Sequence, residues 1–134
     1  MNNILQHLER FHGHLGPYAI VGYKMGELAN HHLGSNPFEK KATVWTGTTP
    51  PLSCIIDGIQ FSSGCTLGKG NITVQPDNTA KALFTNKAGK QLTITLKPEI
   101  IQEIESTVTK ENMHEYSQEF YKKTAKELFT MQKP

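Results

Sequence analysis

The sequence predicts an α+β domain in which an antiparallel sheet packs against helices, with N-terminal and C-terminal helices flanking the strands. Three observations support this fold class. Apolar residues recur at helical spacing before Gly34, three short segments between residues 71 and 96 alternate as strands do, and helical spacing returns after Pro98. The chain has 134 residues. This favours a single domain over residues 1–134, since domains usually hold about 100–200 residues.

The first element is expected to be a short helix behind the candidate caps Asn2 and Asn3. Its apolar residues recur at helical spacing: Ile4, Leu5, Leu8 and Phe11. A glycine-containing turn interrupts this pattern. Pro17 then suits the first turn of a second helix, which Gly34 is expected to end.

The second helix is expected to bury one face against the rest of the chain. Its apolar stripe consists of Tyr18, Val21, Met25, Leu28 and Ala29. Gly22 and Gly26 each cost about 1 kcal/mol of helix propensity against alanine. Such a pair is most simply explained by close contact with another backbone, either of a second helix in this chain or of a partner chain.

A strand and a third helix are expected next. Thr43–Thr48 is rich in strand-forming residues, and Pro50-Pro51 ends it. Ser53–Ser63 is expected to be a helix that begins at its serine cap and ends at Gly64. The apolar side of this helix consists of Ile55, Ile56 and Ile59.

The second half of the chain is expected to contain a meander and two helices. The three alternating segments are Asn71–Gln75, Lys81–Thr85 and Leu92–Leu96, and the turns between them predict an antiparallel arrangement. Pro98 begins a helix with Ile100, Ile101, Ile104 and Val108 on one face. Asn112 and Glu115 predict a capping box for a last helix. Its apolar face would hold Tyr116, Phe120, Thr124 and Leu128.

Composition and charge exclude several classes of protein. Fourteen basic residues face twelve acidic ones, and a net charge of +2 is too small and too scattered for a nucleic-acid surface. No apolar run approaches the ~20 residues that a membrane span needs, and the N-terminus lacks the pattern of a signal peptide. Two cysteines do not form a disulfide framework. We therefore expect a soluble cytoplasmic protein with reduced thiols and no nucleic-acid or membrane partner.

The turn before the second helix contains His12-Gly13-His14. Two imidazoles that flank a glycine can converge on one cation, because glycine permits unusual backbone angles. By itself the pattern is weak, since a histidine pair of this kind is more often a surface or structural feature. Metal binding therefore stays one of two interpretations at this point.

The two cysteines lie at the two ends of the expected third helix. Cys54 follows the cap, where the helix dipole favours the thiolate form. The alternative is a small buried apolar side chain, as most free cysteines are. Cys65 follows the end of the same helix, so that a turn back could bring it towards Cys54. A disulfide between them is a further alternative, which the expected cytoplasmic location disfavours.

The glycine-rich segment Gly64–Asn71 invites comparison with a phosphate-binding loop, and the comparison fails. Only three residues separate Gly64 from Gly68, and Gly70 stands where that loop needs a hydroxyl to hold magnesium. The expected helix also precedes the loop instead of following it. Nucleotide hydrolysis is therefore not expected. The segment either receives an anionic ligand beside Lys69 or is simply a tight connection into a strand.

Two separated segments, in the right order, resemble one known family. Phe11–Tyr18 with Gly22–Gly26 is similar to the N-terminal signature of the E-subunit family of formylmethanofuran dehydrogenases. Cys54–Gln60 with Ser63–Asn71 is similar to the second signature of that family. The two signatures span about half of the chain. The remaining strands and helices suit the α+β core of the family without being diagnostic.

The resemblance implies a dimeric core with a metal-binding cleft, and a gene-neighbourhood link to molybdenum or tungsten formylmethanofuran dehydrogenases. It implies that His14, Cys54 and Cys65 share one site, with His12 as a fourth ligand or as a residue that orients the ligands. Some members have a cysteine where Gly16 stands, so a ligand or thiol used there is missing here. Longer members add a cysteine-rich zinc finger, and we expect this chain to be the core domain alone.

Asp57 and Lys69 are the candidate catalytic residues within this resemblance, as groups that contact a substrate or orient a ligand. Asp57 lies almost one helical turn after Cys54, so it could equally be a carboxylate on the helix surface. Nitrogen and sulfur donors favour zinc, with iron or nickel next, over magnesium or calcium. Four protein ligands would make a closed structural site, whereas three would leave one position for water or substrate.

The leading hypothesis is a metal-binding domain in one-carbon or molybdoenzyme metabolism. It would handle a small substrate at an open metal ion or assist a larger molybdenum or tungsten enzyme complex. Two alternatives remain: a non-catalytic metal carrier or sensor, and a structural interaction module in which the histidines and cysteines serve packing. The resemblance also favours a homodimer.

Overall fold

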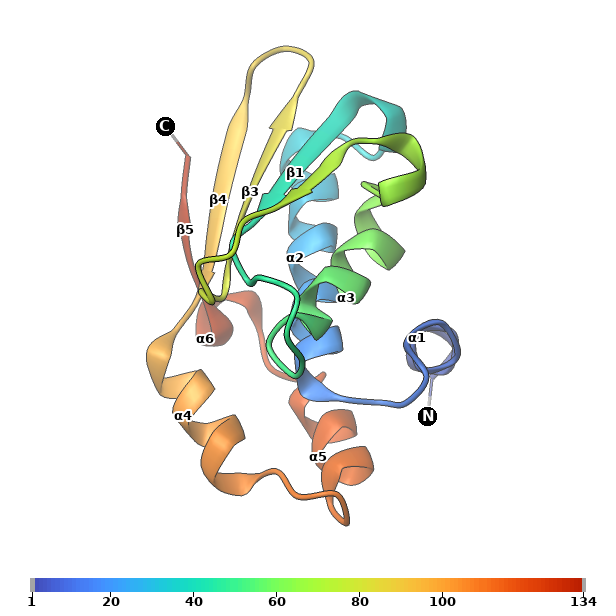
Figure 1. Ribbon diagram of the computed structural model, residues 1–134, viewed down its shortest axis with the longest axis vertical. Coiled ribbons are helices and arrows are strands. Elements are labelled where there is room, and N and C mark those ends of the chain that lie inside the picture. The colour runs from blue at the N-terminus through green and yellow to red at the C-terminus, as the bar shows by residue number, and fades with distance from the viewer. Residues whose placement is uncertain (1, 134) are drawn as a thin grey trace.

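The structure is a computed structural model that describes residues 2–133, and it confirms the α+β fold class (Figure 1). The helices are α1 (Asn3–His12), α2 (Pro17–Leu33), α3 (Cys54–Ser63), α4 (Pro98–Thr107), α5 (Met113–Phe120) and α6 (Ala125–Leu128). Two short 3-10 helices are η1 (Pro37–Glu39) and η2 (Leu67–Lys69). The strands are β1 (Lys40–Val44), β2 (Ile72–Val74), β3 (Lys81–Asn86), β4 (Gln91–Leu96) and β5 (Phe129–Gln132). Across residues 2–133, every helix is too short or too polar to cross a membrane.

The five strands form one sheet in the order β2-β1-β3-β4-β5. The pairs β1–β3, β3–β4 and β4–β5 are antiparallel, as expected, whereas β1 and β2 are parallel. The predicted meander is therefore wrong for its first strand, because β2 pairs with β1 and not with β3. The chain leaves β1, passes through α3 and returns to the sheet beside β1, and a crossover of this kind produces parallel neighbours.

The first strand begins and ends earlier than the sequence predicts. Its observed range is Lys40–Val44, against the expected Thr43–Thr48. Gly47 adopts a φ of 66°, a left-handed conformation that interrupts an extended chain. The strand-forming side chains around Trp45 therefore lie in the irregular connection towards α3.

Helices α2 and α3 lie side by side against one face of the sheet (Figure 1). Their backbones approach so closely that a Cβ built at Gly22 would lie 1.9 Å from the carbonyl oxygen of Ile55. A Cβ at Gly26 would lie 1.9 Å from the Oγ of Ser62, and one at Gly58 would lie 2.1 Å from the carbonyl oxygen of Ala19. The predicted close contact of this glycine face is confirmed, and its partner is a helix of the same chain.

The core lies between these two helices and the sheet. Strands β3 and β4 bury alternate residues, as expected for a sheet with one covered face. The fully buried apolar side chains include Ile20, Met25, Ile55, Ile59, Phe84, Leu92 and Ile94. This core fixes the starts of α2 and α3 relative to each other, which positions the candidate site.

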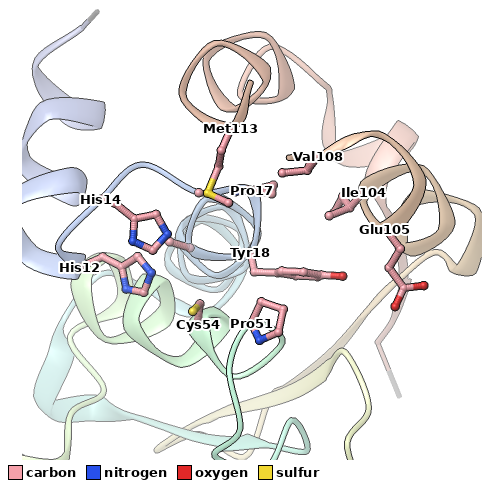
Figure 2. A pocket seen from close by; sticks show the side chains of 12 residues that line it. His12, His14, Pro17, Tyr18, Pro51, Cys54, Ile104, Glu105, Val108 and Met113 are labelled. Atoms are coloured by element: carbon pink, nitrogen blue, oxygen red, sulfur yellow. The ribbon is translucent and has the colours of Figure 1, made fainter. Parts of the chain in front are cut away.

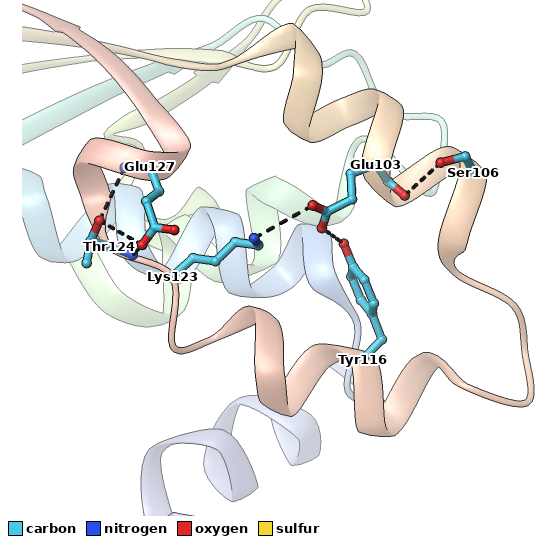
Figure 3. Close-up of polar contacts among 6 residues, drawn as sticks. All are labelled: Glu103, Ser106, Tyr116, Lys123, Thr124 and Glu127. Carbon is cyan, nitrogen blue, oxygen red and sulfur yellow. Dashed lines mark hydrogen bonds and ion pairs between the residues drawn. The ribbon is translucent and has the colours of Figure 1, made fainter.

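The C-terminal part differs from the predicted single helix. Asn112 precedes α5, but its side chain does not cap that helix; its Oδ1 instead accepts a hydrogen bond from the backbone N–H of Thr109. The capping box that forms is at α6, between Thr124 and Glu127 (Figure 3). The chain thus folds into two short helices and a strand because a second cap competes for the same segment.

A polar cluster connects α4 to α5 (Figure 3). The hydroxyl of Tyr116 donates to the carboxylate of Glu103, and the Nζ of Lys123 lies 3.7 Å from the same carboxylate. Burial and the neighbouring Glu103 raise the pKa of Tyr116, so that this hydroxyl stays a donor. These contacts hold α4 and α5 together opposite the start of α2.

Candidate functional site

A cavity of about 230 Å³ lies where α2 and α3 begin (Figure 2). Its near wall comes from the turn before α2 and from the first residues of α2 and α3. Its far wall comes from α4 and the start of α5. The lining residues are His12, His14, Gly16, Pro17, Tyr18, Ala19, Pro51, Cys54, Ile104, Glu105, Val108 and Met113. Three of the four predicted metal ligands therefore share one small, largely apolar space.

His12 is held in a fixed orientation at this cavity. Its side chain is 8% exposed, and its Nδ1 lies 2.6 Å from the Oδ2 of Asp57. Because an ionised carboxylate only accepts, Nδ1 carries the proton and Nε2 presents its lone pair. Nε2 is buried and has no hydrogen-bond partner among residues 2–133. A buried polar atom without a partner costs about 1–3 kcal/mol, so Nε2 is available to a ligand.

The imidazole of His14 lies beside that of His12. The two ring centroids are 4.8 Å apart, with an angle of 43° between the ring planes. Gly13 makes this possible through a φ of 107°, which other residues rarely adopt. A Cβ at Gly16 would lie 3.2 Å from the Nε2 of His14. The glycine at this position therefore leaves the second imidazole its room.

Cys54 is the first residue of α3 and is half-buried at the cavity. The sequence suggested that the start of a helix would favour its thiolate. In the structure the pKa of Cys54 is raised, first by burial and then by the negative charge of Asp57 one helical turn away. The thiol is therefore protonated at neutral pH unless a cation displaces the proton.

The structure does not bring Cys65 to this cavity. Cys65 follows the far end of α3, which has ten residues and separates it from Cys54 by about 15 Å at 1.5 Å per residue. Cys65 is fully buried, and its backbone N–H donates to the Oγ of Ser63. Both cysteines are free. The expected turn back does not occur because a continuous helix lies between the two residues.

The four predicted ligands consequently do not form one preassembled set. Among residues 2–133, no three His, Cys, Asp or Glu side chains are arranged so that they could hold a metal ion. His12, His14 and Cys54 line the same cavity, and Asp57 contacts one of them. A metal ion bound there would require His14 or Cys54 to turn towards Nε2 of His12.

The two candidate catalytic residues lie in different places. Asp57 is next to the cavity and orients His12, although it is not itself one of the lining residues. Lys69 lies in η2, beyond the other end of α3, where its Nζ is 3.2 Å from the Oγ1 of Thr66. It lines a separate pocket together with Phe38. Asp57 thus belongs to the cavity, and Lys69 does not.

Sequence reasoning missed the residues that close the cavity. Figure 2 shows Tyr18 extending across the space towards Glu105, with Met113 above the two histidines. Burial and the charge of Glu105 raise the pKa of Tyr18, so its hydroxyl remains protonated. The sequence placed Tyr18 in a buried stripe of α2. Glu105 and Met113 gave no local signal, because tertiary packing alone brings α4 and α5 to this place.

Comparisons with known proteins agree with the fold. The family model described as "FmdE, Molybdenum formylmethanofuran dehydrogenase operon" matches residues 11–133. An FmdE-like protein of the tungsten formylmethanofuran dehydrogenase type, from Syntrophus aciditrophicus, superposes with a TM-score of 0.71 at 20% identity. The match covers 98% of this chain and 70% of that one, and at this identity it shows the fold alone.

A curated relative matches over a shorter stretch. It is a "Probable S-adenosyl-L-methionine-binding protein" from Archaeoglobus fulgidus, 30% identical over 77 residues. The match covers 54% of this chain and 20% of that protein. The chain therefore spans about a fifth of the length of this relative.

Proposed function

Because this chain belongs to the FmdE family, whose description names the molybdenum formylmethanofuran dehydrogenase operon, we propose that it binds a transition-metal ion in the cavity of His12, His14 and Cys54. One observation carries this proposal. The Nε2 of His12 is buried without a partner among residues 2–133, while the Nδ1 of the same ring is held by Asp57. Histidines that bind metals are typically oriented by a carboxylate in this way.

The donor set favours zinc, and iron or nickel next. Two imidazole nitrogens and one thiolate are borderline to soft ligands, which suit these ions better than magnesium or calcium. A bound zinc ion would act as a Lewis acid on a small ligand at the position that three protein ligands leave open. Asp57 keeps the tautomer of His12 in which Nε2 binds. Cys65 is outside this proposed set, since α3 separates it from the cavity.

The remaining cavity residues would select a small ligand and keep water away. Pro51, Ile104 and Val108 supply apolar walls, and a volume of about 230 Å³ admits a group of few atoms. The hydroxyl of Tyr18 and the carboxylate of Glu105 are the polar groups at its other side. Together with the family description, these features support a role in one-carbon or molybdoenzyme metabolism, by binding a small substrate or by assisting a larger enzyme complex.

Metal analysis of matched variants tests the proposal. We expect about one zinc ion per chain in the wild type after reconstitution, and a strong loss in His12→Ala and Cys54→Ser. Cys65→Ala is the control, because this cysteine is at the far end of α3. Equal metal content in all four proteins would remove the proposed site. Loss in Cys65→Ala with retention in Cys54→Ser would move the site elsewhere.

A non-catalytic metal carrier or sensor is the second candidate. The absence of three preassembled ligands among residues 2–133 favours it, since a site that must rearrange to bind also releases its ion more readily. Rapid transfer of zinc to a chelator, without turnover of any formyl or carbonyl compound, would support this candidate. Turnover of such a compound by the zinc-loaded protein would support the first.

We also propose that the chain forms a homodimer, as the sequence resemblance implies. The glycine face of α2 cannot serve as the interface, because α3 already covers it. Ile4 and Phe11 on α1 are 40% and 53% exposed and offer an apolar surface. Size-exclusion chromatography with light scattering should give twice the chain mass of 15.0 kDa. A mass of one chain at micromolar concentration would contradict the dimer.

A further inference from the structure

A second cavity lies at the other end of α3, remote from His12 and Cys54. Its volume is about 500 Å³, and it opens between η1, the start of β1, η2 and the end of β3. In Figure 1 this is the region where the chain leaves α3 and turns back towards β2. The residues that matter here are Phe38, Lys40, Lys41, Lys69 and Lys87. The proposed metal site uses none of them.

The charge of this cavity is strongly one-sided. Four lysines line it, and Glu39 is the single acid among the lining residues. Within residues 2–133, none of the four ammonium groups is within ion-pair distance of a carboxylate. The carboxylate of Glu39 instead accepts a hydrogen bond from the side-chain amide of Asn36. The lysines therefore concentrate positive charge that the described part of the chain does not neutralise.

Lys40 adds an independent observation. It is 2% exposed, and its Nζ donates to the carbonyl oxygen of Asn36 at 3.1 Å. Burying an ammonium group without a carboxylate is unfavourable, because desolvation is not offset by an opposite charge. An anion in the adjoining cavity would supply that charge. The exposed ammonium groups of Lys41, Lys69 and Lys87 would meet the same anion from other sides.

An exposed aromatic ring lies on the same wall. Phe38 is 72% exposed, although large apolar side chains are usually covered. The Nζ of Lys69 lies 5.6 Å from the centroid of its ring, within the range of a cation–π contact. A planar group that stacked on Phe38 would cover apolar surface while its charged part reached the lysines.

The backbone of the glycine-rich segment does not provide the anion site. The N–H of Leu67 donates to the side chain of Gln60, and those of Lys69 and Gly70 donate within the loop. These amides are therefore already used, in contrast to those of a phosphate-binding loop. The alternative of an anionic ligand beside Lys69, which the sequence left open, depends on lysine side chains.

We propose that this cavity binds a phosphate-bearing small molecule with a planar ring, that is, a ligand of the nucleotide class. The uncompensated lysines would bind its phosphates, and Phe38 would stack on its ring. The volume lies within the range of about 300–1,000 Å³ that is typical of small-molecule sites. This concave shape favours a small ligand over the flat surface of an acidic protein.

Isothermal titration calorimetry with ADP, tripolyphosphate and adenosine tests this site. We expect ADP and tripolyphosphate to bind, and adenosine to bind much more weakly. Lys69→Gln and Lys41→Gln should each weaken ADP binding about fivefold, as for exposed ion pairs. Phe38→Ala should weaken binding of ADP but not of tripolyphosphate. All of these side chains are exposed, so the variants should fold, and far-UV circular dichroism checks that they do.

The control is Lys110→Gln combined with Lys133→Gln, which removes two exposed lysines that do not line this cavity. It should leave ADP binding within about twofold of the wild type, in contrast to Lys41→Gln combined with Lys69→Gln. An equal loss in both double variants would overturn the proposal, since it would show nonspecific attraction. So would the absence of binding of ADP and tripolyphosphate at about 1 mM. Binding of an acidic peptide but not of ADP would also overturn it.

Discussion

The two ring nitrogens of His12 have opposite surroundings, and this asymmetry determines what the residue can do. Nδ1 is bound to Asp57 at 2.6 Å, and Nε2 is buried without a partner among residues 2–133. A histidine that only served packing would find partners for both nitrogens or expose one of them to water. The carboxylate therefore acts through the imidazole, as a positioning residue, and its removal should affect binding more than folding.

Asp57→Asn should lower the affinity for zinc by about 10- to 100-fold, the usual effect of losing a carboxylate that orients a metal-binding histidine. The amide accepts more weakly and can also stabilise the other tautomer. Competition with a zinc-binding dye measures the change. The side chain of Asp57 is 40% exposed, so unfolding in urea should change by less than about 1 kcal/mol.

Asp77→Asn is the matched control, because Asp77 lies in an exposed turn away from the cavity. It removes the same charge and should leave the zinc affinity unchanged. Equal affinities for the wild type and Asp57→Asn would show that Asp57 does not orient a metal ligand. A large loss of stability with unchanged affinity would make the contact between Asp57 and His12 purely structural.

The raised pKa of Cys54 predicts a pH dependence of metal binding. Burial and the charge of Asp57 raise this pKa above its ordinary value of 9.0, so below that value zinc must displace the proton of the thiol. The zinc affinity should therefore rise about tenfold per pH unit between about pH 7.5 and 8.5. In Cys54→Ser the affinity should be lower and the slope much smaller. The same slope in both proteins would exclude Cys54 as a ligand.

At the scale of elements, the contact between α2 and α3 determines where the cavity lies. Three glycines let the two backbones approach, so that the turn before α2 stands opposite the first residue of α3. Gly58 is the most enclosed of the three, since an added Cβ would lie 2.1 Å from the carbonyl oxygen of Ala19 and 2.4 Å from the amide nitrogen of Tyr23. Backbone atoms cannot move aside as a flexible side chain can.

Gly58→Ala should therefore destabilise the protein by about 3 kcal/mol, at the upper end of the usual cost of overpacking. Helix propensity alone predicts the opposite sign, a gain of about 1 kcal/mol. Urea unfolding followed by circular dichroism distinguishes the two. Gly68→Ala is the control, because no atom lies within 4 Å of its added Cβ, and it should be nearly neutral. A stabilised Gly58→Ala would show that the helices are not in close contact.

The elements that sequence could predict are those with local signals at their ends. Asn2, Pro17, Gly34 and Gly64 mark the bounds of α1, α2 and α3 correctly. The pairing of β2 could not be predicted in this way, because the choice between β1 and β3 as its neighbour depends on the path of α3. The capping box at Asn112 was wrong for a related reason, since Thr124 offers the same motif and the local sequence does not decide between them.

The candidate site divides along the same line. His12, His14 and Cys54 belong to short motifs at helix starts, so sequence reasoning could identify them and the resemblance could group them. The far wall, with Glu105 and Met113, depends on the packing of α4 and α5 and carries no local signal. The grouping of Cys65 with the others failed because two motifs close in sequence lie at opposite ends of one helix.

At the scale of the whole molecule, the cavity lies between parts of the chain that are connected unequally. Helices α4 and α5 are joined by Tyr116, Glu103 and Lys123. Helix α1, in contrast, lies at one side of the molecule (Figure 1). It buries only Leu5 and Leu8, and its Phe11 ring contacts Phe61 at 5.9 Å between centroids. A metal ion held by His12 and Cys54 would cross-link the end of α1 to α3.

Zinc should therefore protect α1 from hydrogen exchange more than it protects the sheet. Ligand binding at a hundredfold excess over the dissociation constant stabilises the folded state by about 2.7 kcal/mol. Amides of residues 3–12 exchange through local opening of α1, and this opening breaks the proposed cross-link. Hydrogen exchange followed by mass spectrometry, with and without zinc, measures the difference. Cys65→Ala should respond as the wild type does, and Cys54→Ser should not respond. If zinc slowed exchange in the sheet alone and left α1 unchanged, the ion would be bound elsewhere, and the free Nε2 of His12 would need another ligand.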